Sequence, residues 1–198
     1  TASVTKVTSN AGTINITGRM TAANAITGAG AINVNSGGTL TLATGGGTIS
    51  NTITNNASGN LAVAGTSTLA TNLQNNGNMS ITGSLNMPTR TLSNAGTISI
   101  SGQNSLTAAS YTHTNASKQI YNINSSSDYA QLTCVGCATS LNNSTLEVSI
   151  PTNATINGNF TIFSASSISG TPNSVGRSSL IERMVTINVG NTSINVTV

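Results

Sequence analysis

The sequence predicts an all-β fold, a parallel β-helix solenoid in which short strands stack coil upon coil. The phrase Asn-Ala-Gly-Thr-Ile-x-Ile-x-Gly occupies residues 10–18 and 94–102 and returns in weaker form at 76–83. Glycines at positions 12, 30, 59, 77 and 96 are spaced by about 18 residues, or by close to twice or one and a half times that. A fixed period of this kind indicates a solenoid, here with about 18 to 20 residues and about three short strands per coil.

The composition also fits a solenoid better than a globular domain. Charged residues make up 5% of the 198 residues, aromatic residues 3% and hydrophobic residues 36%, whereas roughly 25% of a typical globular domain is charged. A solenoid tolerates a thin aliphatic core because each coil buries a few small side chains and stacks on its neighbours. A disordered chain would instead combine low hydrophobicity with high charge, so disorder is not indicated.

The net charge of +3 reflects a shortage of acids and not a basic patch. The first acidic residue is Asp128, and only Lys6, Arg19, Arg90 and Lys118 carry charge before it. Nucleic-acid binding needs clustered basic residues, often with stacking aromatics, so we expect no nucleic-acid partner. No apolar run approaches the roughly 20 residues that span a bilayer, so we expect no membrane insertion by this segment.

Strands in the first half are predicted from apolar residues at alternate positions, which place one side chain of every two on the same face. Between them lie Thr, Ser and Asn, which we expect to face outward. The apolar pairs are Ile14 and Ile16, Ile32 and Val34, Leu40 and Leu42, Leu61 and Val63, Met79 and Ile81, and Ile98 and Ile100. Further short strands are expected at 19–21, 67–69, 84–87 and 105–107, with Gly-rich and Asn-rich corners between them.

The pattern changes near residue 120. Longer strands are expected at 121–123, 146–150, 160–163, 184–189 and 193–198, and all three acids and both Phe lie in this half. The open end of a solenoid exposes strand edges that must be capped or paired. We therefore predict one domain with a β-helix repeat region at 1–120 and a C-terminal β cap at 121–198.

An asparagine precedes the turn glycine in three copies of the phrase, as Asn10, Asn76 and Asn94. Two explanations stay open at the level of sequence. Asparagines at one position of successive coils form side-chain amide ladders. Alternatively, asparagine tolerates the left-handed backbone that a turn requires.

Three motifs resemble a known family. Tyr121 is followed by Ser127-Asp128-Tyr129, then by the strand Leu-Glu-Val-Ser-Ile at 146–150, then by Asn-Phe-Thr-Ile-Phe-Ser-Ala at 159–165. This order resembles the C-terminal passenger region of bacterial autotransporters (type V secretion), and the upstream coils look like those of the same passengers and of related haemagglutinin-type adhesins. The resemblance implies a right-handed β-helix whose C-terminal, autochaperone-like region caps the solenoid and helps it to fold outside the cell.

Cys134 and Cys137 form the most conspicuous local motif. A redox pair of the thioredoxin kind would open a helix within a βαβ unit, and no such pattern surrounds them. A structural disulfide in an exported protein is the better interpretation. A structural zinc site needs about four ligands, and only His113 is available beside the two cysteines, so no metal and no cofactor are predicted.

The sequence offers no catalytic constellation. His113, Asp128 and one of many serines could be drawn as a hydrolytic triad, but no nucleophile-elbow motif supports it. Glycan hydrolysis needs a pair of carboxylates, and the repeat region contains none. The three acids, Asp128, Glu147 and Glu182, all lie in the expected cap. We therefore predict that the chain is not an enzyme.

Two functions remain, with a carbohydrate-active β-helix enzyme as a weak third. The first is an extracellular or cell-surface structural and adhesive solenoid, which presents a polar Thr/Ser/Asn surface to neighbouring surface proteins and glycans. The second is a subunit of an extracellular filament, joined end to end with other copies by β-strand pairing. The candidate strand for such pairing is formed by Ser193, Ile194, Asn195, Val196, Thr197 and Val198.

Overall fold

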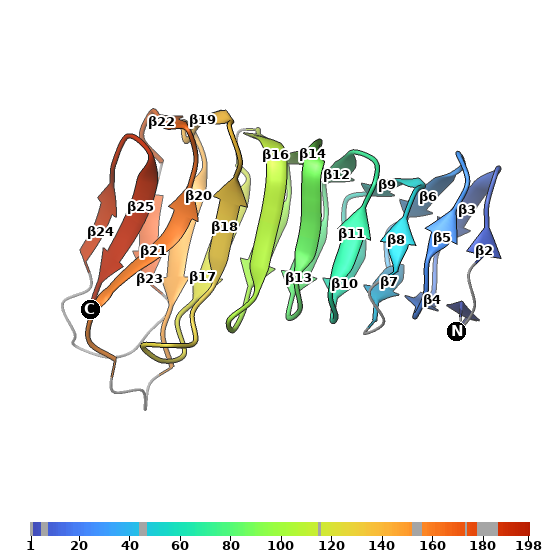
Figure 1. The fold of residues 1–198 in the computed structure, drawn as a ribbon, viewed down its shortest axis with the longest axis horizontal. Coiled ribbons are helices and arrows are strands. Elements are labelled where there is room, and N and C mark those ends of the chain that lie inside the picture. Colours follow the sequence, from blue (N-terminus) through green and yellow to red (C-terminus); the bar gives the residue numbers. More distant parts are fainter. Residues whose placement is uncertain are drawn as a thin grey trace.

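The chain forms an elongated β-solenoid whose two ends lie at opposite ends of the rod (Figure 1). The structure, a computed structural model, describes residues 2–4, 8–43, 47–114, 116–151, 156–172, 174–177 and 186–198. These residues form strands, turns and bends without any helix, and hence no helix that could span a membrane. The predicted all-β parallel β-helix is confirmed.

The strands stack in three columns, and neighbours within a column are parallel. Column 1 holds β1 (Ala2–Val4), β4 (Arg19–Ala22), β7 (Thr39–Leu42), β10 (Asn60–Val63), β13 (Asn78–Ile81), β15 (Thr97–Ile100), β17 (Lys118–Asn122), β20 (Thr145–Ser149) and β23 (Ser174–Arg177). Column 2 holds β2 (Thr8–Ser9), β5 (Ile26–Thr27), β8 (Thr48–Ile49), β11 (Ser67–Leu69), the first parts of β14 (Leu85–Asn94) and β16 (Ser105–His113), β18 (Gln131–Cys134) and β21 (Asn159–Ser164). Column 3 holds β3 (Thr13–Ile16), β6 (Ala31–Val34), β9 (Thr52–Asn55), β12 (Leu73–Asn75) and the last parts of β14 and β16, and β19 (Ala138–Ser140) and β22 (Ser167–Ser169) extend it as a separate pair.

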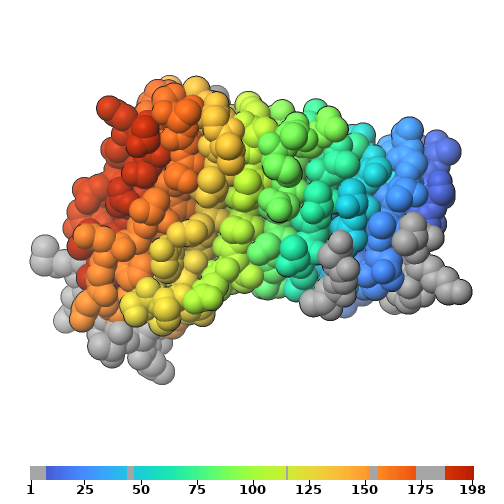
Figure 2. Space-filling model, in the orientation of Figure 1, coloured from blue at the N-terminus to red at the C-terminus, as the bar shows by residue number. Residues whose placement is uncertain are grey.

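The coil length is regular and then increases. Column-1 partners lie 20 residues apart at Met20 and Leu40, and the spacing stays between 18 and 21 residues up to Gln119. It rises to 27 residues from Gln119 to Leu146 and to 29 from Leu146 to Val175. The coils therefore lengthen beyond β17, while parallel stacking continues to β23. Each coil appears as a band across the space-filling view (Figure 2).

The core is a narrow column of aliphatic side chains, as the alternation predicts. In column 3, Ile32, Ile53 and Leu73 are register partners in successive coils and are each at most 1% exposed. Burying one such side chain stabilises the fold by about 1.5 to 3 kcal/mol. The residues that alternate with these side chains along each strand face outward. The inward and outward positions therefore follow directly from the sequence.

The repeated phrase does not occupy one column, which corrects the single series of turn glycines expected from the sequence. Residues 10–18 form the turn before β3 and β3 itself, in column 3, whereas residues 94–102 form the turn before β15 and β15 itself, in column 1. Gly12 and Gly30 thus stack in one turn, and Gly59, Gly77 and Gly96 stack in another. Both columns use four-residue strands with the same inward alternation, so the phrase fits either.

The C-terminal end is closed by two antiparallel strands. β25 (Ser193–Thr197) pairs with β21, and β24 (Thr186–Val189) pairs with β25. Both strands prolong column 2 beyond the last parallel coil at the red end of Figure 1. The expected strand at 184–189 is described only from Thr186 onward, because 184 and 185 lie outside the described residues.

Candidate interaction surfaces and a buried polar cluster

The outer faces of the columns carry small uncharged polar side chains that bond one another along the solenoid. Asn33 Nδ2 donates to Asn15 Oδ1 at 3.0 Å on column 3. Asn78 Nδ2 donates to Asn60 Oδ1 at 3.4 Å on column 1. Adjacent coils lie about 4.8 Å apart, so each outer position repeats as a regular row of hydroxyl and amide groups.

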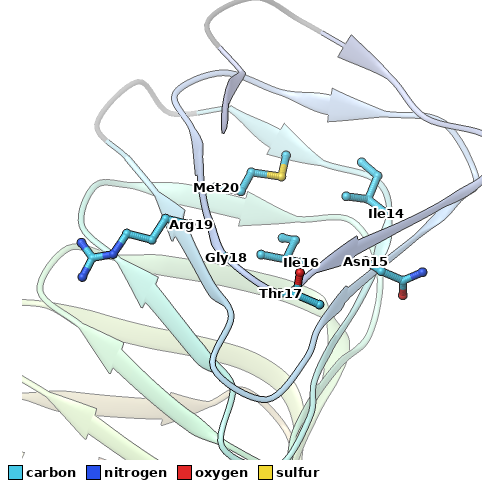
Figure 3. A pocket seen from close by; sticks show the side chains of 7 residues that line it. All are labelled: Ile14, Asn15, Ile16, Thr17, Gly18, Arg19 and Met20. Carbon is cyan, nitrogen blue, oxygen red and sulfur yellow. The ribbon is translucent and has the colours of Figure 1, made fainter. Parts of the chain in front are cut away.

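The N-terminal end of the rod contains a hollow of about 310 Å³, which is lined by residues 14–20. Figure 3 shows Ile16 and Met20 pointing into the coil, while Asn15 and Arg19 point away from it. Ile14 is only partly buried against the core. Among the described residues, β3 pairs along one edge only, with β6. This end therefore offers a strand edge beside one partly uncovered apolar side chain, that of Ile14, while Ile16 and Met20 are buried.

A second, smaller hollow of about 140 Å³ lies where the lengthened coil bulges outward. Its lining consists of Gln103, Ser127, Tyr129 and Gln131. Gln131 Nε2 donates to the Tyr129 hydroxyl at 3.1 Å, and the Tyr129 ring meets Phe160 edge-on at 5.2 Å. The hollow thus combines amide and hydroxyl groups with a half-buried aromatic ring.

A ladder of buried amides runs inside the solenoid at the last inward position of column 3. Asn55 Nδ2 donates to Asn75 Oδ1, and Asn75 Nδ2 donates to Asn94 Oδ1, both at 2.7 Å. Each donating amide also donates to the backbone carbonyl of the first residue of a column-1 strand. Asn55 Nδ2 donates to Asn78 at the start of β13, and Asn75 Nδ2 donates to Thr97 at the start of β15.

The ladder supports the first of the two sequence explanations at Asn94 alone. It contains Asn94, as predicted, but Asn75 in place of Asn76, and it does not include Asn10. None of the three predicted asparagines has the left-handed backbone, because the non-glycine residues with positive φ in the described chain are Ser58, Ala116 and Asn143. An asparagine that continues an alternating apolar run was the signal that could have identified this ladder.

Beyond Asn94 the interior becomes polar and aromatic. We call Asn94, Tyr111, His113, Ser117, Gln119 and Tyr121 the buried polar cluster; all are buried except His113, which is half-buried with both ring nitrogens shielded from solvent. Tyr121 donates to Gln119 Oε1 at 2.8 Å. The Gln119 amide nitrogen, the Tyr111 hydroxyl, the Ser117 hydroxyl and the Asn94 amide nitrogen are buried without a well-formed hydrogen bond. A buried polar group left in this state costs about 1 to 3 kcal/mol, so the cluster is a weak point of the core.

The protonation of the cluster follows from its burial. Burial raises the pKa of Tyr111 well above its ordinary value of 10.0, and the Asn94 side chain partly offsets this effect. Burial, together with the neighbouring Tyr111, raises the pKa of Tyr121 well above 10.0. Burial also lowers the pKa of His113 below its ordinary value of 6.5, and the backbone carbonyls of Ser140 and Thr114 oppose this. The three side chains are therefore uncharged at neutral pH.

Cys134 and Cys137 are joined in a disulfide, with their Cα atoms 5.6 Å apart. The bridge closes the turn between β18 and β19, and Val135 at its tip is 57% exposed. Both cysteines are buried. The surroundings are strands, as expected for a structural bridge, and a disulfide is typical of an oxidising compartment.

The strand predicted for pairing with another copy is already paired within the chain. Ser193 to Thr197 form β25, with β21 on one edge and β24 on the other, and Val198 bonds Gly158 through its backbone. Ile194 and Val196 are fully buried. Using this segment between copies would require it to leave its own sheet.

The described carboxylates lie in separate surroundings. Asp128 accepts from Asn124 Nδ2 at 3.1 Å in the bulge of the lengthened coil. Glu147 forms an ion pair of 2.6 Å with Lys118 on the outer face of column 1. Glu182 lies outside the described residues. In the described ranges, no group of three or more His, Cys, Asp or Glu side chains could hold a metal ion.

Comparisons of the chain with protein-family models, curated proteins and solved structures found no match.

Proposed function

We propose that this chain is a non-catalytic, structural and adhesive β-solenoid of the extracellular space or cell surface. The observation that carries the proposal is the outer surface, on which uncharged Thr, Ser and Asn side chains repeat at the coil spacing and bond one another, as Asn33 does with Asn15. Such rows present alternating donors and acceptors. They suit shallow, repeated contacts with neutral glycans or protein surfaces more than one deep site.

The disulfide supports the proposed location, because such bridges persist in oxidising compartments. The resemblance to autotransporter passengers and haemagglutinin-type adhesins agrees with the same location and remains a proposal.

The test is retention of the protein on beads of neutral polysaccharide (cellulose, chitin and mannan) at about 0.1 M and about 1 M NaCl. Retention on at least one bead type should survive the high salt, because contacts between uncharged groups are not screened. Ser80→Asp, on the outer face of β13, should weaken retention, whereas Glu147→Gln should leave it unchanged. Failure to bind all three materials would refute adhesion to neutral glycans.

We propose end-to-end assembly into a filament as the second candidate function. It is supported by the N-terminal edge of β3 and the adjoining hollow that Ile14, Ile16 and Met20 help to line. An unpaired edge beside apolar side chains is a template for another strand. Because β25 is paired on both sides, the edge of β24 opposite β25 replaces it as the opposing surface.

Electron microscopy of the purified chain tests this candidate. Filaments should form with the native chain and be abolished by Ile14→Lys, which puts a charge at the hollow. Asn15→Lys, on the outward side of the same strand, should leave them intact. Separate short rods at high protein concentration, or filaments that persist with Ile14→Lys, would exclude assembly through this edge.

A further inference from the structure

The interior amide ladder ends at the single histidine of the chain. Asn94 pairs in register with His113, so the imidazole stands where the next amide of the ladder would be. The two preceding steps, from Asn55 to Asn75 and from Asn75 to Asn94, are complete. At the third step, the Asn94 amide nitrogen and both His113 ring nitrogens are buried and make no well-formed hydrogen bond, although the Ser140 and Thr114 carbonyls act on His113 and the Asn94 side chain acts on Tyr111.

The protonation state of His113 decides what it offers to the ladder. A neutral imidazole has one acceptor nitrogen, which complements the NH₂ group of Asn94. An imidazolium has two donors and no acceptor, so it opposes a donor with a donor. A charge is also costly on this half-buried ring, because its nitrogens are shielded from solvent, unless a counter-charge faces it.

No counter-charge faces His113 in the described part of the chain. On β14 its register partner is the uncharged Asn94, and on its own strand the Tyr111 ring centroid lies 5.7 Å from that of His113. β19 contributes the carbonyl of Ser140, and Thr114, the residue after β16, contributes its own carbonyl. From β17, Tyr121 reaches the cluster as a neutral phenol.

The charged groups nearby in the chain are occupied elsewhere. Lys118 pairs with Glu147 on the outer face of column 1. Asp128 bonds Asn124 in the outer bulge.

We propose that His113 makes the contact between β14 and β16 an acid-sensitive seam, at which protonation of the imidazole breaks the interior ladder and loosens the solenoid between two adjacent coils. The seam lies between the regular coils and the longer C-terminal coils. It divides the rod into two parts whose own coil contacts are unaffected by the histidine.

The direction of the pH effect follows from the lowered pKa of His113. The unfolded chain binds the proton more tightly than the folded one, so folding stability is complete above about pH 6.5 and is lost as the pH falls toward the lowered folded-state value. Because the sequence holds one histidine, it is the side chain whose ordinary pKa of 6.5 places its titration in the unfolded chain between about pH 5.5 and about pH 7.5.

The test compares melting temperatures across this pH range for the native chain, His113→Asn and His113→Leu. The melting temperature of the native chain should decrease as the pH decreases. The melting temperatures of both His113 variants should not change with pH. His113→Asn should also melt higher than His113→Leu, because an amide supplies the acceptor that Asn94 requires. Gln74→His, which adds a histidine on the exposed outer face of column 3, is the matched control and should behave like the native chain.

Hydrogen exchange locates the effect. At about pH 5.5, amides of β14 and β16 in the native chain should exchange faster than at about pH 7.5, after correction for the intrinsic rate, while those of β7 and β10 should not change. A native melting temperature that is flat across this range would overturn the proposal. So would a pH dependence that persists in both His113 variants, or acceleration spread evenly over all coils.

Discussion

The Asn75→Ala substitution tests whether the interior amide ladder holds successive coils together. The Asn75 side chain is fully buried and makes three hydrogen bonds. It accepts from Asn55 at 2.7 Å, and it donates to Asn94 Oδ1 at 2.7 Å and to the Thr97 carbonyl at 3.1 Å. Alanine removes all three at once and fills none of the vacated space.

The expected cost can be worked out from these contacts. Each hydrogen bond contributes about 1 kcal/mol net, and a buried acceptor left without a donor costs about 1 to 3 kcal/mol more. Asn55 keeps its bond to the Asn78 carbonyl at 2.9 Å, which limits the loss on that side. We therefore expect Asn75→Ala to lower the free energy of unfolding by about 3 to 5 kcal/mol.

Guanidinium denaturation followed by circular dichroism measures this change. Asn60→Ala is the matched control, because its exposed amide accepts a single bond from Asn78 at 3.4 Å and should cost less than about 0.5 kcal/mol. The slope of the transition must be compared as well, since coils of a solenoid can unfold in steps. If the two variants differ by less than about 0.5 kcal/mol, the ladder does not stabilise the fold.

Three further outcomes are expected. Gly96→Ala should destabilise by about 1 to 3 kcal/mol in a thermal melt, because the new Cβ would lie 2.0 Å from a backbone oxygen of the preceding coil. Gly18→Ala, at the same turn position with nothing within 4 Å, should leave the melting temperature nearly unchanged. An equal decrease in melting temperature in the two variants would contradict the explanation by close backbone contact. Reducing the disulfide should cost about 2 kcal/mol, given the short loop that it closes, measured as the shift in denaturation midpoint with and without reductant; no shift would show that the bridge contributes nothing. Glu147→Gln should lower the free energy of unfolding by less than about 1 kcal/mol, because Lys118 in the ion pair is 37% exposed. A loss that does not change when salt is added would indicate lost packing and not a lost charge interaction.

The fold class could be predicted because each coil of a solenoid is determined by short, local sequence patterns. The alternation of Ile32 with Val34, or of Leu61 with Val63, determines which side chains face the core, and all members of the predicted pairs are buried except Ile14, which is partly buried. Tertiary packing repeats the same local unit, so it adds little that the strand pattern does not already contain.

The column of each strand could not be predicted in the same way. The phrase at 10–18 and the phrase at 94–102 specify a turn, a strand and a turn, but nothing in them distinguishes column 3 from column 1. Column identity depends on the number of residues in the preceding turns, which varies along the chain.

The interior ladder was located only in part because the sequence signal was assigned to the turn. The glycine phrase drew attention to Asn76, whereas the inward position belongs to Asn75, two residues after Leu73. In the same way His113 continues the alternation of Tyr111 and is half-buried, with both ring nitrogens shielded from solvent. A polar residue at an expected apolar position was the more informative feature in both cases.

The occurrence of one phrase in two columns also has a consequence for how the chain reaches its fold. If the repeated phrase alone determined how a new coil packs, its strand could pack in the wrong column with almost no loss of local contacts. The inward amides at Asn55, Asn75 and Asn94 remove this degeneracy, because each finds its partner in one alignment alone. These amides then select the correct alignment of the coils as well as stabilise it. A chain without them should accumulate misaligned, slowly rearranging coils during refolding.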